Sequence, residues 1–139
     1  MPTTSTQDEI ELAKLPVARI QDVLLSRMVV REEGTRLGFA PQALTQMATA
    51  VSEITRNVVQ HAGGGGQVRV LKLIELGRCG LKITVEDSGV GIADIDRALA
   101  GASPGAGIPG SRRLMDQFAI QSGSGRGTAV TMVKWLPNV

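Results

Sequence analysis

The stretch that decides the fold reads PQALTQMATAVSEITRNVVQHAGGGG and covers residues 41–66. A proline suits the first turn of a helix, and a run of glycines cannot continue one. Between these ends the apolar side chains recur at helical spacing and form one stripe over four turns. The stripe consists of Leu44, Met47, Ala48, Val51, Ile54 and Val58. The sequence therefore predicts a long amphipathic helix that begins at Pro41 and ends before Gly63.

Three polar residues lie beside this stripe. Glu53, Asn57 and His61 occupy positions i, i+4 and i+8, so their side chains project from one side of the helix. Such spacing is usually the solvated flank of a surface helix. Taken alone, it carries no functional assignment.

A second helix is predicted upstream. Asp22 is a candidate N-cap, and Gly38 suits a left-handed stop. Gly34 inside this helix costs about 1 kcal/mol relative to alanine. The apolar positions that follow helical spacing are Leu25, Met28, Val29 and Leu37. Residues 1–12 are polar and are interpreted as a flexible lead-in, and the alternation from Val17 to Gln21 favours the start of a sheet there.

Strands are predicted after the glycines. Val68–Leu76 and Leu81–Val85 have the pattern of a hairpin joined across Gly77 and Gly80. The remaining predicted elements are a short helix over Ala93–Leu99, a helix that starts around Pro109 and carries Leu114, Met115 and Phe118, and two strands that flank Gly123–Gly127 and end near Trp135.

This order of elements predicts an α+β fold. We expect one domain over residues 1–139, built as a two-layer α/β sandwich with a mixed, mostly antiparallel sheet and the helices on one face. The other face of the sheet stays available for a partner.

Composition excludes several functional classes. The net charge is +2 and aromatic residues make up 2% of the chain, so nucleic acid is not an expected partner. One Cys and one His cannot supply a disulfide or a zinc site. There is no apolar run of about 18 residues and no apolar signal segment, so we expect a soluble, cytoplasmic protein with no membrane partner.

The first glycine loop is Asp87-Ser88-Gly89-Val90-Gly91, directly after a predicted strand. A carboxylate only accepts hydrogen bonds, so Asp87 suits the exocyclic amine of adenine and disfavours the carbonyl of guanine. Gly89 and Gly91 let a base and the backbone approach closely. The alternative interpretation is an ordinary turn.

The second glycine loop is Gly105-Ala106-Gly107-Ile108-Pro109-Gly110. Gly105, Gly107 and Gly110 precede or open a helix, where backbone amides can bind phosphate oxygens. The G-x-G-x-x-G pattern of this loop also matches a dinucleotide-binding fingerprint. However, no βαβ unit surrounds the loop and no acidic residue follows about 20 residues later. A P-loop is absent, and His61 as the only histidine does not support a nucleophilic triad.

In this order and spacing, the segments Glu53–Asn57, Asp87–Gly91 and Gly105–Gly110 resemble the nucleotide-binding boxes of the Bergerat-type (GHKL) ATPases and kinases. The pair Gly127-Thr128 resembles the one that closes the adenine pocket in that family, although a plain β-turn explains it as well. The resemblance implies that ATP lies between the Glu53/Asn57 helix and the glycine loops, with Asp87 and Thr128 at the adenine.

The resemblance also implies roles for the helix side chains. Asn57 is then the Mg²⁺ ligand, and Glu53 orients or deprotonates the acceptor hydroxyl. One amide oxygen together with the triphosphate is sufficient for Mg²⁺. Arg56 is a candidate for phosphate contact, and a solvated helix face explains it equally well.

Within the family, Val17–Trp135 resembles the bacterial switch serine/threonine kinases of the RsbT type, most clearly over Gly107–Phe118. That resemblance implies phosphorylation of a serine or threonine on a STAS-domain protein of a stressosome, followed by release onto a PP2C-type phosphatase. An anti-sigma-factor kinase that sequesters a sigma factor is the alternative. A non-catalytic ATP-binding docking module also stays open, because Ile92–Gly105 is shorter than the lid expected for these kinases. The oligomeric state is open too.

Overall fold

The computed structural model describes residues 7–61, 65–88, 108–122 and 127–137. The helices are α1 (Ile20–Leu37), α2 (Pro41–His61) and α4 (Ile108–Leu114). The strands are β1 (Gln7–Val17), β2 (Gly66–Glu75), β3 (Arg78–Asp87), β4 (Gln117–Ser122) and β5 (Thr128–Trp135).

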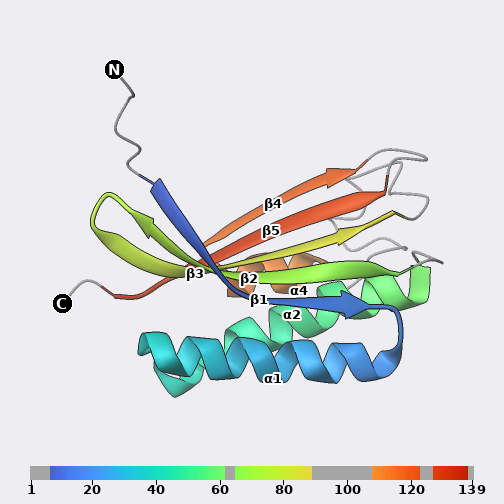
Figure 1. The fold of residues 1–139 in the computed structure, drawn as a ribbon, viewed down its shortest axis with the longest axis horizontal. Coiled ribbons are helices and arrows are strands. Elements are labelled where there is room, and N and C mark those ends of the chain that lie inside the picture. The colour runs from blue at the N-terminus through green and yellow to red at the C-terminus, as the bar shows by residue number, and fades with distance from the viewer. Residues whose placement is uncertain (1–6, 62–64, 89–107, 123–126, 138–139) are drawn as a thin grey trace.

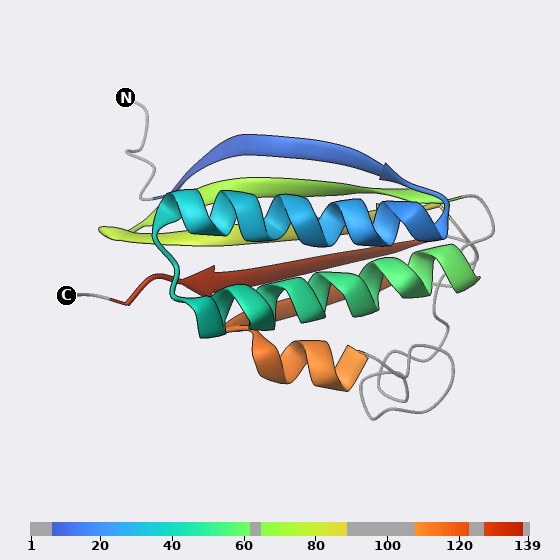
Figure 2. The same cartoon turned by 90° about the horizontal axis from the view of Figure 1, so that it is seen from below.

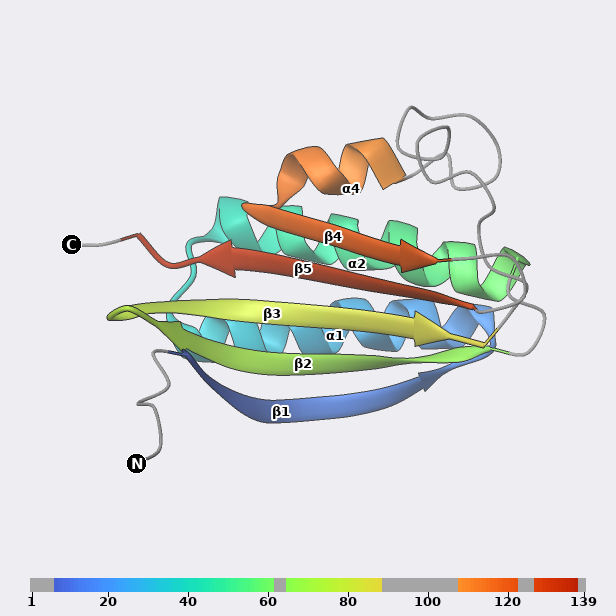
Figure 3. The same cartoon turned by 90° about the horizontal axis from the view of Figure 1, so that it is seen from above.

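The elements form two layers (Figure 1), with the helices on one face of a five-stranded sheet (Figures 2 and 3). The strand order is β1-β2-β3-β5-β4, and each pair of neighbours is antiparallel. The predicted α+β sandwich is confirmed. No parallel pair occurs among the described strands, so the sheet is not mixed there.

The start of the chain differs from the prediction. From Gln7 onward the expected flexible lead-in is wrong, because β1 runs from Gln7 to Val17 and pairs with β2 along its length. The expected strand start at Val17–Gln21 is also wrong, since Val17 ends the strand and Ile20 begins α1. The polar pattern misleads because Glu9 and Glu11 pair with cations of β2 and β3 that lie far away in sequence.

The N-cap of helix α1 lies three residues earlier than predicted. Its N-cap is Arg19, and Asp22 lies at the third helical position, where Oδ2 accepts the backbone N–H groups of Ala18 and Arg19 at 2.9 Å each. These two hydrogen bonds hold the pKa of Asp22 below its ordinary value. The predicted stop at Gly38 is confirmed by its φ of 100°.

The predicted apolar positions of α1 divide between two sides of the helix, because Val29 and Leu37 pack against the core and the other two do not. Leu25 and Met28 are 47% and 63% exposed, and Ile20 and Leu24 lie exposed beside them. The core takes the opposite side of the helix, which includes Val23, Ser26, Val30 and Gly34. A Cβ on Gly34 would lie 2.7 Å from Cδ2 of Leu44, so this glycine lets α1 approach α2 closely.

Helix α2 is confirmed, and its whole predicted stripe is buried. It packs against the inner face of the sheet, where the core continues through Val68, Val70, Leu81, Ile83, Val85, Val130 and Met132. In the described part of the chain, no helix is both long and apolar enough to cross a membrane.

The predicted hairpin is confirmed with a tighter turn. Leu76 and Gly77 are the two turn residues, with φ of 52° and 80°, the conformation that two-residue hairpins favour. Gly80 lies inside β3, where a Cβ would stand 2.8 Å from the Trp135 ring. The glycine therefore makes room for the tryptophan.

The helix predicted from Pro109 is shorter than expected. It ends at Leu114, Met115 is buried just after it, and Phe118 belongs to β4, so the placement of Phe118 on a helix is wrong. The two predicted final strands are confirmed as β4 and β5. The predicted helix over Ala93–Leu99 lies outside the described residues.

Candidate functional site

Two predicted adenine-binding residues meet at one end of the sheet. Asp87 is the last residue of β3 and Thr128 the first of β5, and the two are cross-strand partners. Because side chains alternate along a strand, they share the face of Val85 and Val130, which belong to the core beneath the helices. The C-terminal end of α2 lies at the same end of the molecule (Figure 1).

A third polar side chain completes this group. Ser122, the last residue of β4, is the cross-strand partner of Thr128. Its Oγ lies 2.8 Å from Oγ1 of Thr128 and donates to the carbonyl oxygen of Gly127 at 2.9 Å. The sequence analysis missed Ser122. Its place at the end of the strand before the Gly127-Thr128 pair is the signal that could have found it.

The three strand ends border a pocket of about 400 Å³. It is lined by Glu86, Asp87, Gln121, Ser122, Gly127, Thr128 and Ala129. Asp87 and Thr128 thus line the same pocket, and their contact with adenine stays a prediction. Glu53 and Asn57 of α2 are not among the described residues that line this pocket.

Two glycines hold the backbone of Asp87 between them. A Cβ on Gly127, whose φ is 74°, would lie 2.2 Å from the Asp87 carbonyl oxygen. On the other side, a Cβ on Gly66 would lie 2.1 Å from the carbonyl oxygen of Glu86 and 3.1 Å from Cα of Asp87. Contacts this short exclude any side chain at either glycine, so both neighbouring strands set the position of Asp87.

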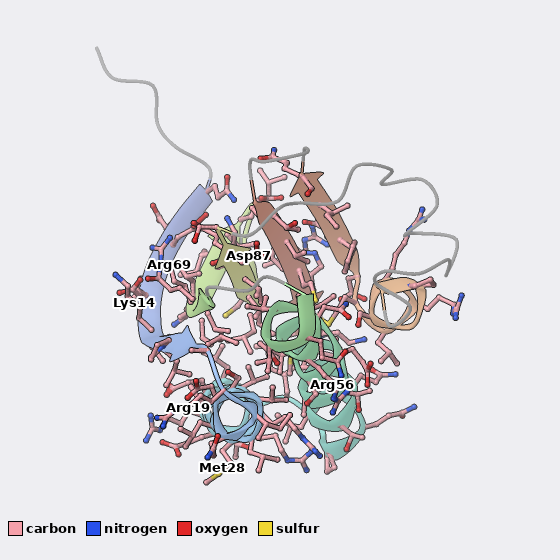
Figure 4. All side chains as sticks on the ribbon, turned by 90° about the vertical axis from the view of Figure 1, so that its right-hand side faces the viewer. Lys14, Arg19, Met28, Arg56, Arg69 and Asp87 are labelled. Atoms are coloured by element: carbon pink, nitrogen blue, oxygen red, sulfur yellow. The ribbon has the colours of Figure 1, made fainter. Side chains whose placement is uncertain are left out.

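Glu53 and Arg56 form an ion pair on α2. Nη1 of Arg56 donates to Oε1 of Glu53 at 2.7 Å. The side chain of Glu53 is 39% exposed and that of Arg56 is 37% exposed. Figure 4 shows Arg56 on the helix layer and Asp87 on the strand layer. An exposed pair of this kind contributes at most about 1 kcal/mol, so Glu53 can leave Arg56 at little cost.

Asn57 carries an unpaired buried amide. Its Nδ2 is shielded from solvent and has no hydrogen-bond partner among the described residues. Leaving a buried donor unsatisfied costs about 1–3 kcal/mol. A buried side-chain amide in this state has a free donor for a ligand, and the amide oxygen of an asparagine is a hard donor of the kind that Mg²⁺ prefers.

The glycine-rich loops are only partly described. Gly89, Gly91, Gly105 and Gly107 lie outside the described residues, so their predicted contacts stay predictions. Gly110 lies inside α4, where a Cβ would meet no described atom within 4 Å. Nothing in the described packing therefore requires glycine at position 110.

The donor set limits the metal chemistry of the described residues. Within residues 7–61, 65–88, 108–122 and 127–137, no group of three or more His, Cys, Asp or Glu side chains could hold a metal ion. A cation held by Asn57 would need further oxygens from another molecule. The triphosphate of a nucleotide supplies such oxygens.

Sequence comparisons identify the family of the chain. The family model for the histidine kinase-like ATPase domain matches residues 17–134. The chain is 38% identical over 120 residues to the serine/threonine-protein kinase RsbT of Bacillus subtilis, covering 83% of this chain and 90% of that protein. It is also 38% identical over 107 residues to an anti-sigma F factor of Pasteuria penetrans, covering 68% and 70% of the two chains.

Solved structures with the same fold include two more distant proteins. The RsbU and RsbW domains of a Mycobacterium tuberculosis protein superpose with a TM-score of 0.63 at 19% identity, over 91% of this chain and 34% of that one. A histidine kinase domain from the blue-light-activated kinase of Erythrobacter litoralis superposes with a TM-score of 0.53 at 20% identity, over 96% and 69%. At these identities the likeness shows the fold alone.

Proposed function

The chain belongs to the family of histidine kinase-like (GHKL) ATPase domains, and on that premise we propose that it is an ATP-dependent serine/threonine protein kinase. Its proposed substrate is a STAS-domain protein in a partner-switching pathway that regulates a sigma factor in a stress response. The similarity to a serine/threonine-protein kinase over 90% of that protein supports the reaction type.

The observation that carries this proposal is the pairing of Asp87 with Thr128 across two strands, on the side of the sheet that faces the helices. Asp87 accepts from the amino group of adenine, and Thr128 lies beside the base. A carboxylate against a 6-carbonyl would leave two acceptors facing each other, so the site favours ATP over GTP.

The helix residues act at the phosphate end of the same nucleotide. Asn57 is the proposed Mg²⁺ ligand, and an ion held there would supply positive charge to the phosphate that is transferred. Glu53 turns from Arg56 to accept the proton of the acceptor hydroxyl as that oxygen attacks the γ-phosphorus. The bond from this phosphorus to the bridging oxygen breaks, and ADP leaves with that oxygen. Such general-base assistance contributes about 10²- to 10⁴-fold in rate. Arg56, once Glu53 leaves it, is the proposed contact for phosphate oxygens.

The predicted loop contacts remain part of this proposal. Gly89, Gly91, Gly105, Gly107 and Gly110 are proposed to let the base and phosphates approach the backbone. A PP2C-type phosphatase is the proposed second partner, reached after phosphorylation, and a lone cysteine with an ATP co-substrate fits action in the cytoplasm.

A second candidate is an anti-sigma-factor kinase that sequesters a sigma factor. It is favoured by the anti-sigma F factors among the relatives, including one of Clostridium novyi that is 26% identical over 88% of this chain. The two candidates share the phosphotransfer step and differ in the protein bound afterwards. Copurification distinguishes the two candidates: a sigma factor should copurify with an anti-sigma-factor kinase, and a phosphatase with the switch kinase.

The experiment is transfer of radiolabel from γ-labelled ATP to purified STAS-domain proteins of the same source, with and without Mg²⁺. Wild type should label one of them only when Mg²⁺ is present. Glu53→Gln should abolish labelling while Mg-ATP binds with unchanged affinity, and Asp87→Asn should weaken ATP binding. Hydrolysis of ATP without any labelled protein would contradict the kinase assignment.

A matched control exists on α1. Glu32 forms the same kind of exposed ion pair, with Arg36 at 2.9 Å, but lies on another helix. Glu32→Gln should leave labelling unchanged. If Glu53→Gln and Glu32→Gln behave alike, Glu53 is not the base.

A further inference from the structure

Two hydrogen bonds of the Ser122 hydroxyl group together determine which way the hydroxyl group of Thr128 donates its proton. Ser122 Oγ lies 2.9 Å from the carbonyl oxygen of Gly127 and 2.8 Å from Oγ1 of Thr128. A carbonyl oxygen only accepts, so the one proton of Ser122 is donated to Gly127. The proton in the second bond therefore belongs to Thr128, which donates it to Ser122.

With its proton given to Ser122, Thr128 can only accept from a ligand. Its cross-strand partner Asp87 presents a carboxylate, which also only accepts. Both residues line the same pocket of about 400 Å³. Asp87 and Thr128 therefore offer a ligand in this pocket hydrogen-bond acceptors alone. Thr128 acts as an acceptor because its own proton is donated to Ser122.

We propose that Ser122 is a specificity-determining residue: by taking the Thr128 proton, it makes the pocket select a purine with an amino group at position 6 over one with a carbonyl there. This inference rests on the proposed function, because it assumes that the base of ATP lies against Asp87 and Thr128. An amino group carries two N–H donors, one for each acceptor. A 6-carbonyl would face lone pairs only, which leaves it without a hydrogen bond.

The role of Ser122 is positioning, because its hydroxyl acts through Thr128. Without that hydroxyl, Thr128 can rotate its O–H into the pocket and donate to a 6-carbonyl. The β4–β5 backbone ladder does not depend on the Ser122 side chain. Removing the hydroxyl should therefore change which base is preferred more than it changes the fold.

The test measures dissociation constants of ATP and inosine triphosphate (ITP) by calorimetry on the full chain with Mg²⁺. The two bases differ in the group at position 6 and in the proton that ITP carries on N1. Wild type should prefer ATP. Ser122→Ala should lower the ITP-to-ATP ratio of dissociation constants by roughly 3- to 10-fold, the effect of one hydrogen bond. Ser122→Thr keeps a hydroxyl and should keep the ratio. Thr131→Ala removes a hydroxyl from the opposite face of β5 and should also keep it.

Thr128→Val supplies a second route to the same question. If Ser122 acts through Thr128, adding Ser122→Ala to Thr128→Val should leave the ratio unchanged, since the group that Ser122 orients is already gone. This cycle also keeps the inference testable if Ser122→Ala alone is poorly folded.

The outcomes separate this inference from the proposed function. If wild type binds neither nucleotide, the proposed function fails. If wild type binds ATP and ITP equally, or Ser122→Ala weakens both by the same factor, ATP binding stands and the specificity role of Ser122 is overturned. Additive effects of Ser122→Ala and Thr128→Val would also overturn it.

Discussion

Gly127 lies so close to Asp87 that a Cβ on the glycine would stand 2.2 Å from the Asp87 carbonyl oxygen. The glycine that precedes Thr128 therefore positions the residue opposite it. This contact joins the two strand ends of the proposed adenine pocket, so a change at Gly127 should act on both stability and nucleotide binding.

Gly127→Ala should weaken ATP binding by more than about tenfold, because the methyl group would push Asp87 out of place. It should also lower the free energy of unfolding, since a positive φ alone costs alanine about 1–2 kcal/mol. The control is Gly77→Ala, where φ is 80° but no atom lies within 4 Å of a Cβ. In urea unfolding, Gly77→Ala should lower the free energy of unfolding by the cost of the positive φ alone, and its affinity for ATP should be unchanged. Equal losses in the two variants would contradict the contact.

Asn57→Leu should lose Mg-dependent ATP binding without losing stability. The buried Nδ2 has no partner among the described residues, so an apolar side chain of similar size should leave the free energy of unfolding unchanged or raise it by about 1 kcal/mol. In Ser52→Ala, by contrast, a satisfied buried hydroxyl is lost from the same helix, at a cost of about 1 kcal/mol. Should both variants destabilise the nucleotide-free protein equally, the amide of Asn57 is partnered in solution.

The two faces of α1 should respond differently to substitution. Leu24 and Met28 lie on the exposed face, so Leu24→Gln and Met28→Gln should each change the free energy of unfolding by less than about 0.5 kcal/mol. Val30→Ala empties a fully buried position and should cost about 1.5–3 kcal/mol. Urea denaturation of the three variants measures this, and a large cost for Met28→Gln would show that its face is covered.

Asp22 should make the protein sensitive to acid. Hydrogen bonds from Ala18 and Arg19 lower its pKa in the folded state, so the unfolded chain takes up a proton first as the pH falls. The resulting stability is present above the unfolded value of about 3.8 and is lost as pH falls through the folded pKa. In Asp22→Ala this part of the pH dependence should be missing from unfolding curves measured between about pH 5 and 2. Asp8→Ala, on exposed β1, should retain it.

Local chemistry explains what could be predicted. The α2 helix follows from the spacing of Leu44, Met47 and Val51, and the β2–β3 hairpin follows from Gly77 and its flanking alternation. Asp87 and Thr128 were predicted as site residues because loop motifs keep short spacings along the chain. Features of this kind depend on neighbours within about four residues, so they can be read before any tertiary contact is known.

The errors share a different origin. Leu25 and Met28 have helical spacing, but so do Val23 and Val30, and periodicity alone does not say which set faces the core. The strand β1 was missed because its charges find their partners on β2 and β3. Ser122 was missed because its significance appears only when β4 lies beside β5.

By itself, the sequence determined that this chain has an amphipathic helix bearing Glu53 and Asn57, glycine-rich turns, and an acceptor at Asp87. Helical period and turn chemistry are properties of a few adjacent residues, so they can be predicted from the sequence without any tertiary contact. Only the tertiary structure decided that Gly66 and Gly127 enclose Asp87 and that the hydroxyl groups of Ser122 and Thr128 lie within hydrogen-bond distance. Those relations join strands through backbone pairing, and cross-strand partners are set by the whole sheet rather than by any one segment.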